Sequence, residues 1–309
     1  MAGVPVMFIL VVASLCFAVT LPALRGTGLR RLFPLDGRPL DGRPLNAGNL
    51  DYKLQSSPKL VVGGVYSVLG IALCIGMFPL LPWLRAGPAS SRAFAVLAAL
   101  VLALVVGMLD DARKPHGLAW PVKLVGQWLA ASCYLAIPDA PVAAIVAIPW
   151  LIVCMNAWNF LDNTDGAAAA TGLGSLIPLL IVLAGTMPAV DSRLAAALTG
   201  VLAGLVPFNW PRAHAYLGDG GAHVLGLFLG LVALDLYPAG GAAAMLAIHA
   251  LPLLDFVQVL YVRICLGVPP WRGDRRHLAH RLQRVMPVAW IAPAFFAIQA
   301  LATTLGLTR

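Results

Sequence analysis

The chain has 309 residues, of which 60% are hydrophobic and only 11% are charged, and its mean hydropathy is +0.87. Soluble domains carry roughly 25% charged residues, so this composition excludes an ordinary soluble protein and predicts an integral membrane protein. The net charge of +8 does not indicate nucleic-acid binding here, because basic residues of membrane proteins gather in cytoplasmic loops.

Apolar runs predict an all-α, polytopic membrane protein with about ten transmembrane helices in a single domain, residues 1–309. The first run lacks a basic segment before it and is long enough to span, so we expect a retained helix rather than a cleaved signal. The spans are expected near residues 4–24, 61–84, 93–109, 122–137, 141–157, 168–190, 193–207, 221–237, 239–262 and 286–306.

Lys and Arg residues predict the orientation of these spans. All but Arg85, Arg92, Arg193 and Arg309 lie in or beside the odd-numbered connections. Because cytoplasmic loops carry the basic excess, we expect the odd connections to be cytoplasmic and both termini to face outward. The first connection repeats Asp-Gly-Arg-Pro-Leu at 36–45, a local duplication without an assigned function. The Gly63-Gly64 pair that follows it permits close backbone approach.

Polar residues cluster in the odd connections. Asp110 and Asp111 end the third span; on a helix they diverge by about 100°, so one could face a metal or phosphate, although a solvated loop explains them too. Lys123 could meet a phosphate or extend to the lipid headgroups. If the stretch 156–166 is helical, Asn159, Asp162 and Asp165 share one face; otherwise it is a polar loop closed by glycine.

Two later connections are also candidates for a phosphate site. The glycines around Asp219 would leave backbone amides open beside a helix N-terminus, a geometry suited to phosphate and to a metal, or they form an ordinary turn. His277 and His280, on one helix face, could bind a diphosphate or carry a proton, whereas the neighbouring arginines could simply contact lipid headgroups.

The outer connections are poorer in acidic groups. Asp139, Asp191 and Asp235 are isolated there and are interpreted as helix-end residues, and only Asp255 is a candidate for an ionisable group inside the membrane.

Oxygen ligands without zinc-type spacing favour Mg²⁺, and basic loops favour an anionic substrate. The pattern therefore predicts a membrane enzyme that joins a soluble phosphate compound to a lipid, at a cleft on the cytoplasmic face.

The motifs resemble those of the polyprenyl-phosphate N-acetylhexosamine-1-phosphate transferases, a family that includes phospho-MurNAc-pentapeptide translocase. The resemblance runs from Lys53 to Leu282, and Pro252-Leu253-Leu254-Asp255 with Arg263 and Gly267 looks like the initiating-transferase branch. Its motifs are Asp110-Asp111, Asn156-x-x-Asn159-x-x-Asp162-x-x-Asp165-Gly166, Asn209 with Gly218-Asp219, and Asp274-x-x-His277-x-x-His280.

The resemblance implies transfer of a sugar-1-phosphate from a UDP-sugar to undecaprenyl phosphate, with release of UMP, as the first membrane step of a cell-envelope polysaccharide such as O-antigen. It implies a Mg²⁺ cofactor, for which Mn²⁺ could substitute, a location in the bacterial inner membrane, and membrane lipid as surroundings. A homodimer is compatible with it. A carrier or flippase for lipid phosphates, and a catalytically inactive family member, are the alternatives.

The family's functional residues carry over by motif. The resemblance implies that Asp219 is the main Mg²⁺ ligand and Asp110 the candidate base beside Asp111. The remaining assignments by resemblance are Asn159 and Asp162 in the catalytic cleft, Asp165, Asn209 and Tyr216 in the nucleotide pocket, Lys123 and His277 at phosphates, and Arg276 and His280 at the substrate.

Four departures from the family pattern are visible. Ala279 stands where a histidine is usual, and Leu60-Val61-Val62 replaces Pro-Arg before the Gly-Gly pair. Asn163-Thr164 and Ala222 differ from the more usual residues as well. These changes leave the choice of sugar open, and the loss of a histidine is the observation behind the inactive alternative.

Overall fold

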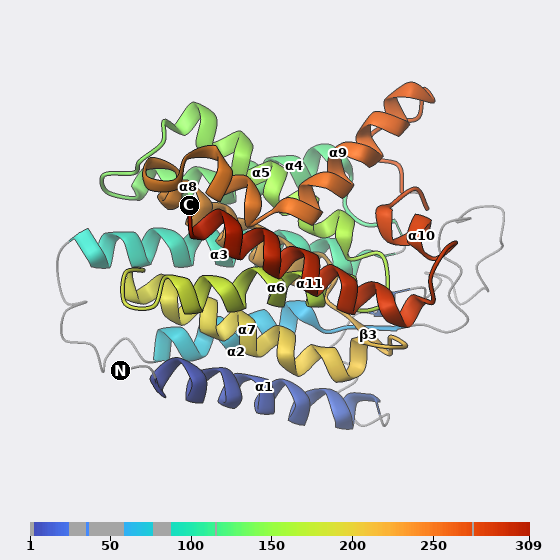
Figure 1. Ribbon diagram of the computed structural model, residues 1–309, viewed down its shortest axis with the longest axis horizontal. Helices are drawn as coiled ribbons and strands as arrows, with labels where there is room; N and C mark the ends of the chain where they lie inside the picture. The colour runs from blue at the N-terminus through green and yellow to red at the C-terminus, as the bar shows by residue number, and fades with distance from the viewer. Residues whose placement is uncertain (1–2, 25–34, 37–58, 77–87, 115, 274) are drawn as a thin grey trace.

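The computed structural model describes residues 3–24, 35–36, 59–76, 88–114, 116–273 and 275–309 (Figure 1). The 36–45 repeat, Lys53 and Asp274 therefore lie wholly or largely outside the described residues. The elements are α1 (Gly3–Leu24), β1 (Leu35–Asp36), β2 (Lys59–Val61), α2 (Gly63–Gly76), α3 (Pro88–Ala112), α4 (Trp120–Ser132), the 3-10 helix η4 (Cys133–Ala136), α5 (Ala144–Leu161), α6 (Ala167–Val182), α7 (Ala189–Asn209), β3 (Ala215–Tyr216), α8 (Gly218–Ala247), α9 (Ala250–Cys265), α10 (Leu278–Leu282) and α11 (Val288–Leu307).

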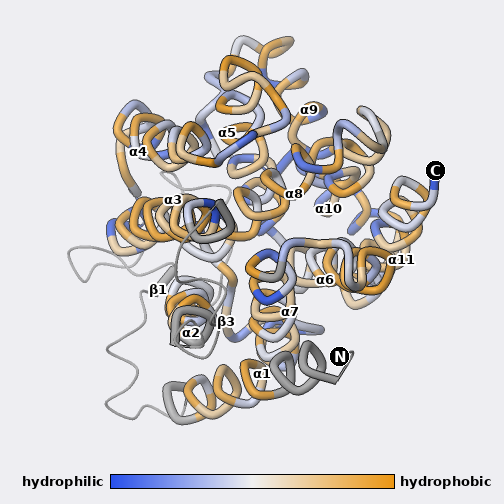
Figure 2. Tube along the Cα trace, turned by 90° about the vertical axis from the view of Figure 1, so that its left-hand side faces the viewer, coloured by the Kyte–Doolittle hydropathy of each residue, from blue (hydrophilic) through white to orange (hydrophobic). Residues whose placement is uncertain are grey.

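The helices form one bundle, with most of them running roughly along its long axis, and the chain termini lie toward the end away from β3 and α10 (Figure 1). Seen along the bundle, α8 lies among the other helices (Figure 2), where it contacts α2, α3, α5 and α11. Within the described residues, the all-α prediction is confirmed apart from three short strands. A helix overlaps each predicted span, but five described helices are long and apolar enough to cross a membrane, or six with one bent pair.

The bent pair corrects the predicted boundary between the eighth and ninth spans. The helix α8 continues past residue 237 with a break at Gly241, whose φ is 60°, and the segments Gly241–Ala247 and Ala250–Cys265 meet at 82°. Backbone groups freed by the bend between Ala247 and Ala250 need internal partners in an apolar setting. Gln299 supplies them: its side chain donates to the carbonyls of Ala247 and Ile248 and accepts the N–H of Leu251. The direction of α9 is thereby fixed.

The three strands bring the start of α2 to the start of α8. β2 pairs antiparallel with β1 and parallel with β3, and Val61 lies opposite Tyr216 in the register. The predicted close approach at Gly63 is confirmed, since a Cβ atom there would lie 1.9 Å from the carbonyl oxygen of Leu217. The segment Leu60-Val61-Val62, where the sequence departs from the family pattern, therefore positions Tyr216 through the backbone.

At the other end of the bundle, Arg92 on α3 joins two carboxylates from different helices. Its Nη2 lies 2.7 Å from Oδ2 of Asp191 on α7, and it also contacts Asp235 on α8. The prediction that Asp191 and Asp235 are isolated is therefore wrong, although Asp191 does lie at a helix end, in the first turn of α7. The sequence gives no signal for this pairing, because 99 and 143 residues separate the partners.

We expect Arg92→Met to destabilise the protein. Asp191 is only 2% exposed, so loss of Arg92 leaves a buried carboxylate with no cation, which costs about 3–5 kcal/mol in buried pairs. A lower midpoint of thermal unfolding in detergent would show this. Arg284→Met, at an exposed arginine, serves as the control and should leave the midpoint unchanged. Equal midpoints for the two variants would contradict the prediction.

Candidate active site

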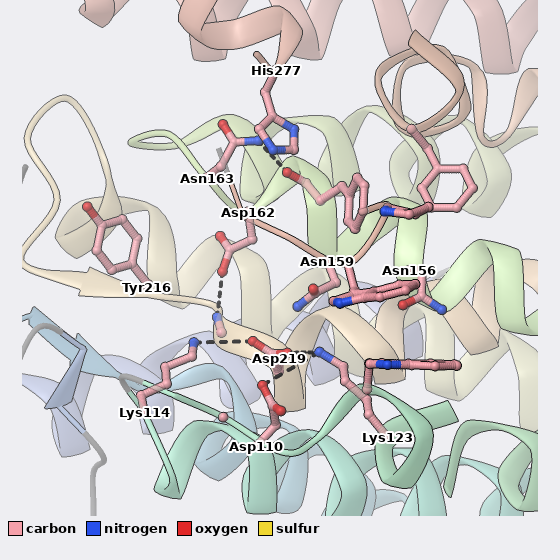
Figure 3. Close-up of a pocket in the computed structure, with 18 of the residues that line it drawn as sticks. Asp110, Lys114, Lys123, Asn156, Asn159, Asp162, Asn163, Tyr216, Asp219 and His277 are labelled. Atoms are coloured by element: carbon pink, nitrogen blue, oxygen red, sulfur yellow. Dashed lines mark hydrogen bonds and ion pairs between the residues drawn. The ribbon is translucent and has the colours of Figure 1, made fainter. Parts of the chain in front are cut away.

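A cavity of about 750 Å³ opens at the end of the bundle that carries β3 and α10 (Figure 3). Its walls come from the α3–α4 connection, α4, the end of α5, the start of α8, α9 and the segment around α10. The sequence-predicted site residues that line it are Asp110, Lys123, Asn159, Asp162, Asp165, Tyr216, Asp219, His277 and His280. Residues from five separate connections or helix ends thus meet in one place.

On one wall of the cavity, carboxylates and lysines alternate (Figure 3). Lys123 contacts Asp219 and lies 3.5 Å from Oδ2 of Asp110. Lys114 lies 2.7 Å from Oδ1 of Asp111 and 3.2 Å from Oδ1 of Asp219. Asp110 also accepts the N–H of Leu118 at 2.7 Å. Both ammonium groups at this wall are thus paired with carboxylates of the protein, and phosphate oxygens also suit such point charges.

The N-terminus of α8 is occupied by carboxylates of the protein itself. The N–H of Gly218 donates to Asp162 at 2.6 Å, and the N–H groups of Asp219 and Gly220 donate to Asp111 at 3.1 and 3.0 Å. The expectation that these amides are open for a phosphate is therefore wrong. The cause is that unsatisfied amides and the helix dipole favour a negative charge, which Asp111 and Asp162 provide. Asp111 itself does not line the cavity.

The polar stretch 156–166 is only partly helical. α5 ends at Leu161, Asp162 follows as its cap residue, and Gly166 has a φ of 77° at the start of α6. The prediction that Asp162 and Asp165 share a helix face with Asn159 is therefore wrong. The alternative of a polar loop is confirmed for residues 162–166. Burial raises the pKa of the Asp162 carboxyl to about 7, against the opposing effect of the Gly218 N–H. A cation in the cavity would favour its ionised form.

Asp165 fixes the part of the wall that carries Tyr216. Its carboxylate accepts the N–H of Ala213 at 3.0 Å and the hydroxyl of Tyr216 at 3.2 Å. Asn209, predicted in the nucleotide pocket, does not line the cavity; its side chain donates to the carbonyl of Ala215 at 2.8 Å. Asn209 therefore lies behind β3 and supports the strand that holds Tyr216.

At the opposite wall, His277 precedes α10 and His280 lies within it, with ring centroids 6.0 Å apart. Arg276, predicted to bind substrate, does not line the cavity, whereas its neighbour Arg275 does. His277 belongs to no helix, so the expected shared helix face with His280 is not formed, although both side chains reach the same cavity.

Sequence reasoning missed two parts of the site. Lys114 is not among the predicted site residues, although its position three residues after Asp111 is a signal for an ion pair. Gln127 on α4 exchanges hydrogen bonds with Asn156 on α5, with donor to acceptor distances of 3.2 and 2.8 Å, and contacts His223 on α8 at 3.1 Å. Nothing in the local sequence indicates that contact between three helices.

Ala279, the departure that suggested an inactive protein, faces away from the cavity. It is fully buried in an apolar cluster with Leu161, Leu251, Ile291 and Phe295. Position 279 does not line the cavity in this chain, so the alanine removes no group from the cavity wall. The substitution therefore gives no support to the inactive alternative.

We expect Ala279→His to lower stability without raising activity. An imidazole placed in this apolar cluster would have its polar nitrogens unpaired, at a cost of about 1–3 kcal/mol. Thermal unfolding in detergent measures the loss. Gln283→His is the matched control, because Gln283 lines the cavity and a histidine there can meet water. A gain of activity in Ala279→His would show that its side chain reaches the substrate.

The wall that carries Asp110 and Asp219 has the oxygen ligands for a magnesium ion that also binds oxygens of a substrate. Among the described residues, no three His, Cys, Asp or Glu side chains converge as a preformed metal site. Asp110 and Asp219 already lie on either side of one cation, the Lys123 ammonium. These two carboxylates would hold Mg²⁺, with water and phosphate oxygens completing the shell, as is usual for this ion.

The comparisons with known proteins agree with the motifs. The sequence model of glycosyl transferase family 4 matches residues 93–237, a segment that runs from α3 to α8 and carries the wall around Asp219. The resemblance to this family is confirmed over the matched segment. The matched segment contains Asp110, Lys123, Asp162 and Asp219, and the histidines near α10 lie beyond it.

Individual relatives are bacterial. A Streptomyces coelicolor protein provisionally named a glycosyltransferase is 33% identical over 239 residues, covering 74% of this chain and 55% of its own. The decaprenyl-phosphate N-acetylglucosaminephosphotransferase of Mycolicibacterium smegmatis is 29% identical over 280 residues, covering 76% and 67%. The undecaprenyl-phosphate alpha-N-acetylglucosaminyl 1-phosphate transferase of Thermotoga maritima is 24% identical over 187 residues, covering 58% of each chain. The chain thus spans about half to two thirds of the length of these relatives.

Proposed function

We propose that the protein transfers a sugar-1-phosphate, with an N-acetylhexosamine as the sugar, from a UDP-sugar to a polyprenyl phosphate and releases UMP. The observation that carries the proposal is the convergence of Asp110 and Asp219 with Lys114 and Lys123 on one cavity wall. That wall lies within the segment that matches the family. The named relatives act on decaprenyl or undecaprenyl phosphate, which supports a polyprenyl phosphate as acceptor.

In this proposal an oxygen of the lipid phosphate attacks the β-phosphorus of the UDP-sugar. The new P–O bond forms as the bond between the β-phosphorus and the α–β bridging oxygen breaks, and UMP leaves with that oxygen. Mg²⁺ held by Asp110 and Asp219 would supply neutralisation of the diphosphate charge. Lys114 and Lys123 bind phosphate oxygens, and their contacts with Asp219 hold both ammonium groups at the wall. Asp110 is the candidate base, although an attacking phosphate dianion does not require one.

The nucleotide is proposed to lie beside Tyr216, which offers an aromatic face for uracil. Asp165 orients that ring through the hydroxyl hydrogen bond of 3.2 Å, and Asn209 supports it from behind through Ala215. Asn159, at the end of α5, also lines the cavity, between Asp162 and Asp219 in Figure 3. We place this end of the bundle at the cytoplasmic face of the membrane, because the predicted orientation assigns the basic connections to that side.

A panel of UDP-sugars tests the proposal. Purified protein would be incubated with Mg²⁺ and either undecaprenyl or decaprenyl phosphate, and UMP release would be measured for each donor. We expect UMP release with at least one UDP-N-acetylhexosamine and none without the lipid. Absence of UMP with every donor and both lipids would contradict the proposed transferase activity. Movement of lipid phosphate across vesicle membranes without UMP would favour a flippase instead.

A further inference from the structure

A buried carboxylate lies directly behind His277. Asp255, on α9, is fully buried and does not line the cavity. Its Oδ2 lies 2.7 Å from Nδ1 of His277, and its Oδ1 accepts the N–H of Leu278 at 2.5 Å. One carboxylate thus holds both the backbone at the start of α10 and the imidazole that precedes it. Neither the proposed reaction nor the family match assigns a role to Asp255.

Aromatic side chains fix the plane of the same imidazole. The ring of Phe160, on α5, meets the His277 ring edge to face, with centroids 5.6 Å apart and an interplanar angle of 81°. Phe160 packs in turn against Phe256, and the Arg263 guanidinium lies 4.9 Å from the Phe160 centroid. The charged or titratable side chains around His277 in these contacts are Asp255 and Arg263 on α9 and His280 on α10.

The partner of Nδ1 determines what the other ring nitrogen can do. An ionised carboxylate accepts hydrogen bonds and does not donate them, so Nδ1 carries a proton when it bonds to Asp255. Nε2 is then the nitrogen left for a ligand in the cavity that His277 lines. His277 lies across this cavity from Lys114 and Lys123 (Figure 3). A phosphate oxygen accepts hydrogen bonds, so it can bind Nε2 only when that nitrogen carries a proton as well.

The position of Asp255 depends on the bend between α8 and α9. Asp255 lies in the second turn of α9, and Gln299 fixes the direction in which that helix leaves the break. The carboxylate is therefore presented by a rigid element rather than by the segment that carries His277. Support of a ligand by a buried second residue of this kind is common where orientation matters.

We propose that Asp255 is a positioning residue, which holds His277 with a proton on Nδ1 and its Nε2 toward a phosphate of the nucleotide-sugar donor. The phosphate part of this statement rests on the proposed function. The orientation and protonation of the ring do not, so the two can be tested separately.

A double-mutant cycle tests whether Asp255 acts through His277. We expect Asp255→Asn and His277→Gln each to lower kcat/KM for the nucleotide sugar by about 10- to 100-fold, mainly through KM, as for supporting residues of bound ligands. The double variant should be no worse than His277→Gln alone, because residues that act as a unit are not additive. Asp255→Glu, which keeps the charge, should recover part of the activity. Full additivity, or equal loss in Asp255→Asn and Asp255→Glu, would overturn the proposal.

Nitrogen-15 NMR of histidine-labelled protein in nanodiscs gives a readout independent of turnover. The chain has six histidines, so the His277 signals are assigned by their disappearance in His277→Gln. We expect a protonated Nδ1 in the wild type and a changed state in Asp255→Asn, whose amide can offer an N–H to Nδ1. Asp235→Asn, the same change at the opposite end of the bundle, is the control. Identical His277 signals in wild type and Asp255→Asn would overturn the proposal. If the wild type releases no UMP, only the proposed function fails.

Discussion

Replacement of Asp219 by asparagine is expected to abolish turnover while the protein stays folded. Asp219 faces both Lys114 and Lys123 and is one of the two carboxylates that would hold Mg²⁺. Loss of about 4 kcal/mol of charge stabilisation corresponds to roughly a 1,000-fold lower rate. UMP release with the best donor of the UDP-sugar panel, measured across a Mg²⁺ titration, gives the magnitude.

The fold should survive because each lysine keeps another carboxylate. Lys114 retains Asp111 at 2.7 Å, and Lys123 retains Asp110 at 3.5 Å. Asp235→Asn is the matched control: it removes a carboxylate on the same helix at the other end of the bundle, where it pairs with Arg92. We expect that control to lose stability and keep turnover, the reverse of Asp219→Asn. Near-normal turnover of Asp219→Asn would refute its assignment as the metal ligand.

Local patterns predicted the helices well and their ends poorly. Each apolar run overlaps a helix because burial of long apolar segments requires internal hydrogen bonding. The end of α5 at Leu161 could not be predicted, since Asp162 leaves the helix to cap α8, which begins 56 residues later in the chain. The prediction of open amides at Gly218 and Gly220 is wrong for the same reason. The carboxylates that accept these N–H groups are distant in the sequence, so the local sequence does not indicate them.

Motif spacing predicted most of the residues that gather around the cavity. It did not predict which of them line it and which support it from behind. Asp110 and Asp111 are adjacent in the sequence, yet only Asp110 lines the cavity, while Asp111 binds the backbone of α8. Their divergence on a helix was predictable; which of them turns inward depends on the packing of α3 against α8. Likewise, the sequence predicts Asp255 as an ionisable group within a span and as part of the motif Pro252-Leu253-Leu254-Asp255, but its contact with His277 is visible only in the fold.

Gly107→Ala is expected to disrupt the acidic wall from outside the cavity. A Cβ atom at Gly107 would lie 2.5 Å from the carbonyl oxygen of Asp219 and from Cα and N of Gly220. These are backbone atoms, so α3 and α8 must separate rather than a side chain move aside. Separation breaks the bonds between Asp111 and the N-terminus of α8 and moves Asp110 away from Asp219.

We expect a loss of about 1–3 kcal/mol in stability from overpacking and a fall in turnover of roughly 100-fold, because a shift of about 1 Å at reacting groups costs that much. Gly70→Ala is the matched control, since its Cβ would meet Val201 and Ala197 at ordinary distances of 3.4 and 3.6 Å. Thermal unfolding and UMP release, compared for the two variants, separate the local contact from a general effect of alanine in a helix. If Gly107→Ala keeps turnover like Gly70→Ala, the close contact of α3 with α8 is not what brings Asp110 to Asp219.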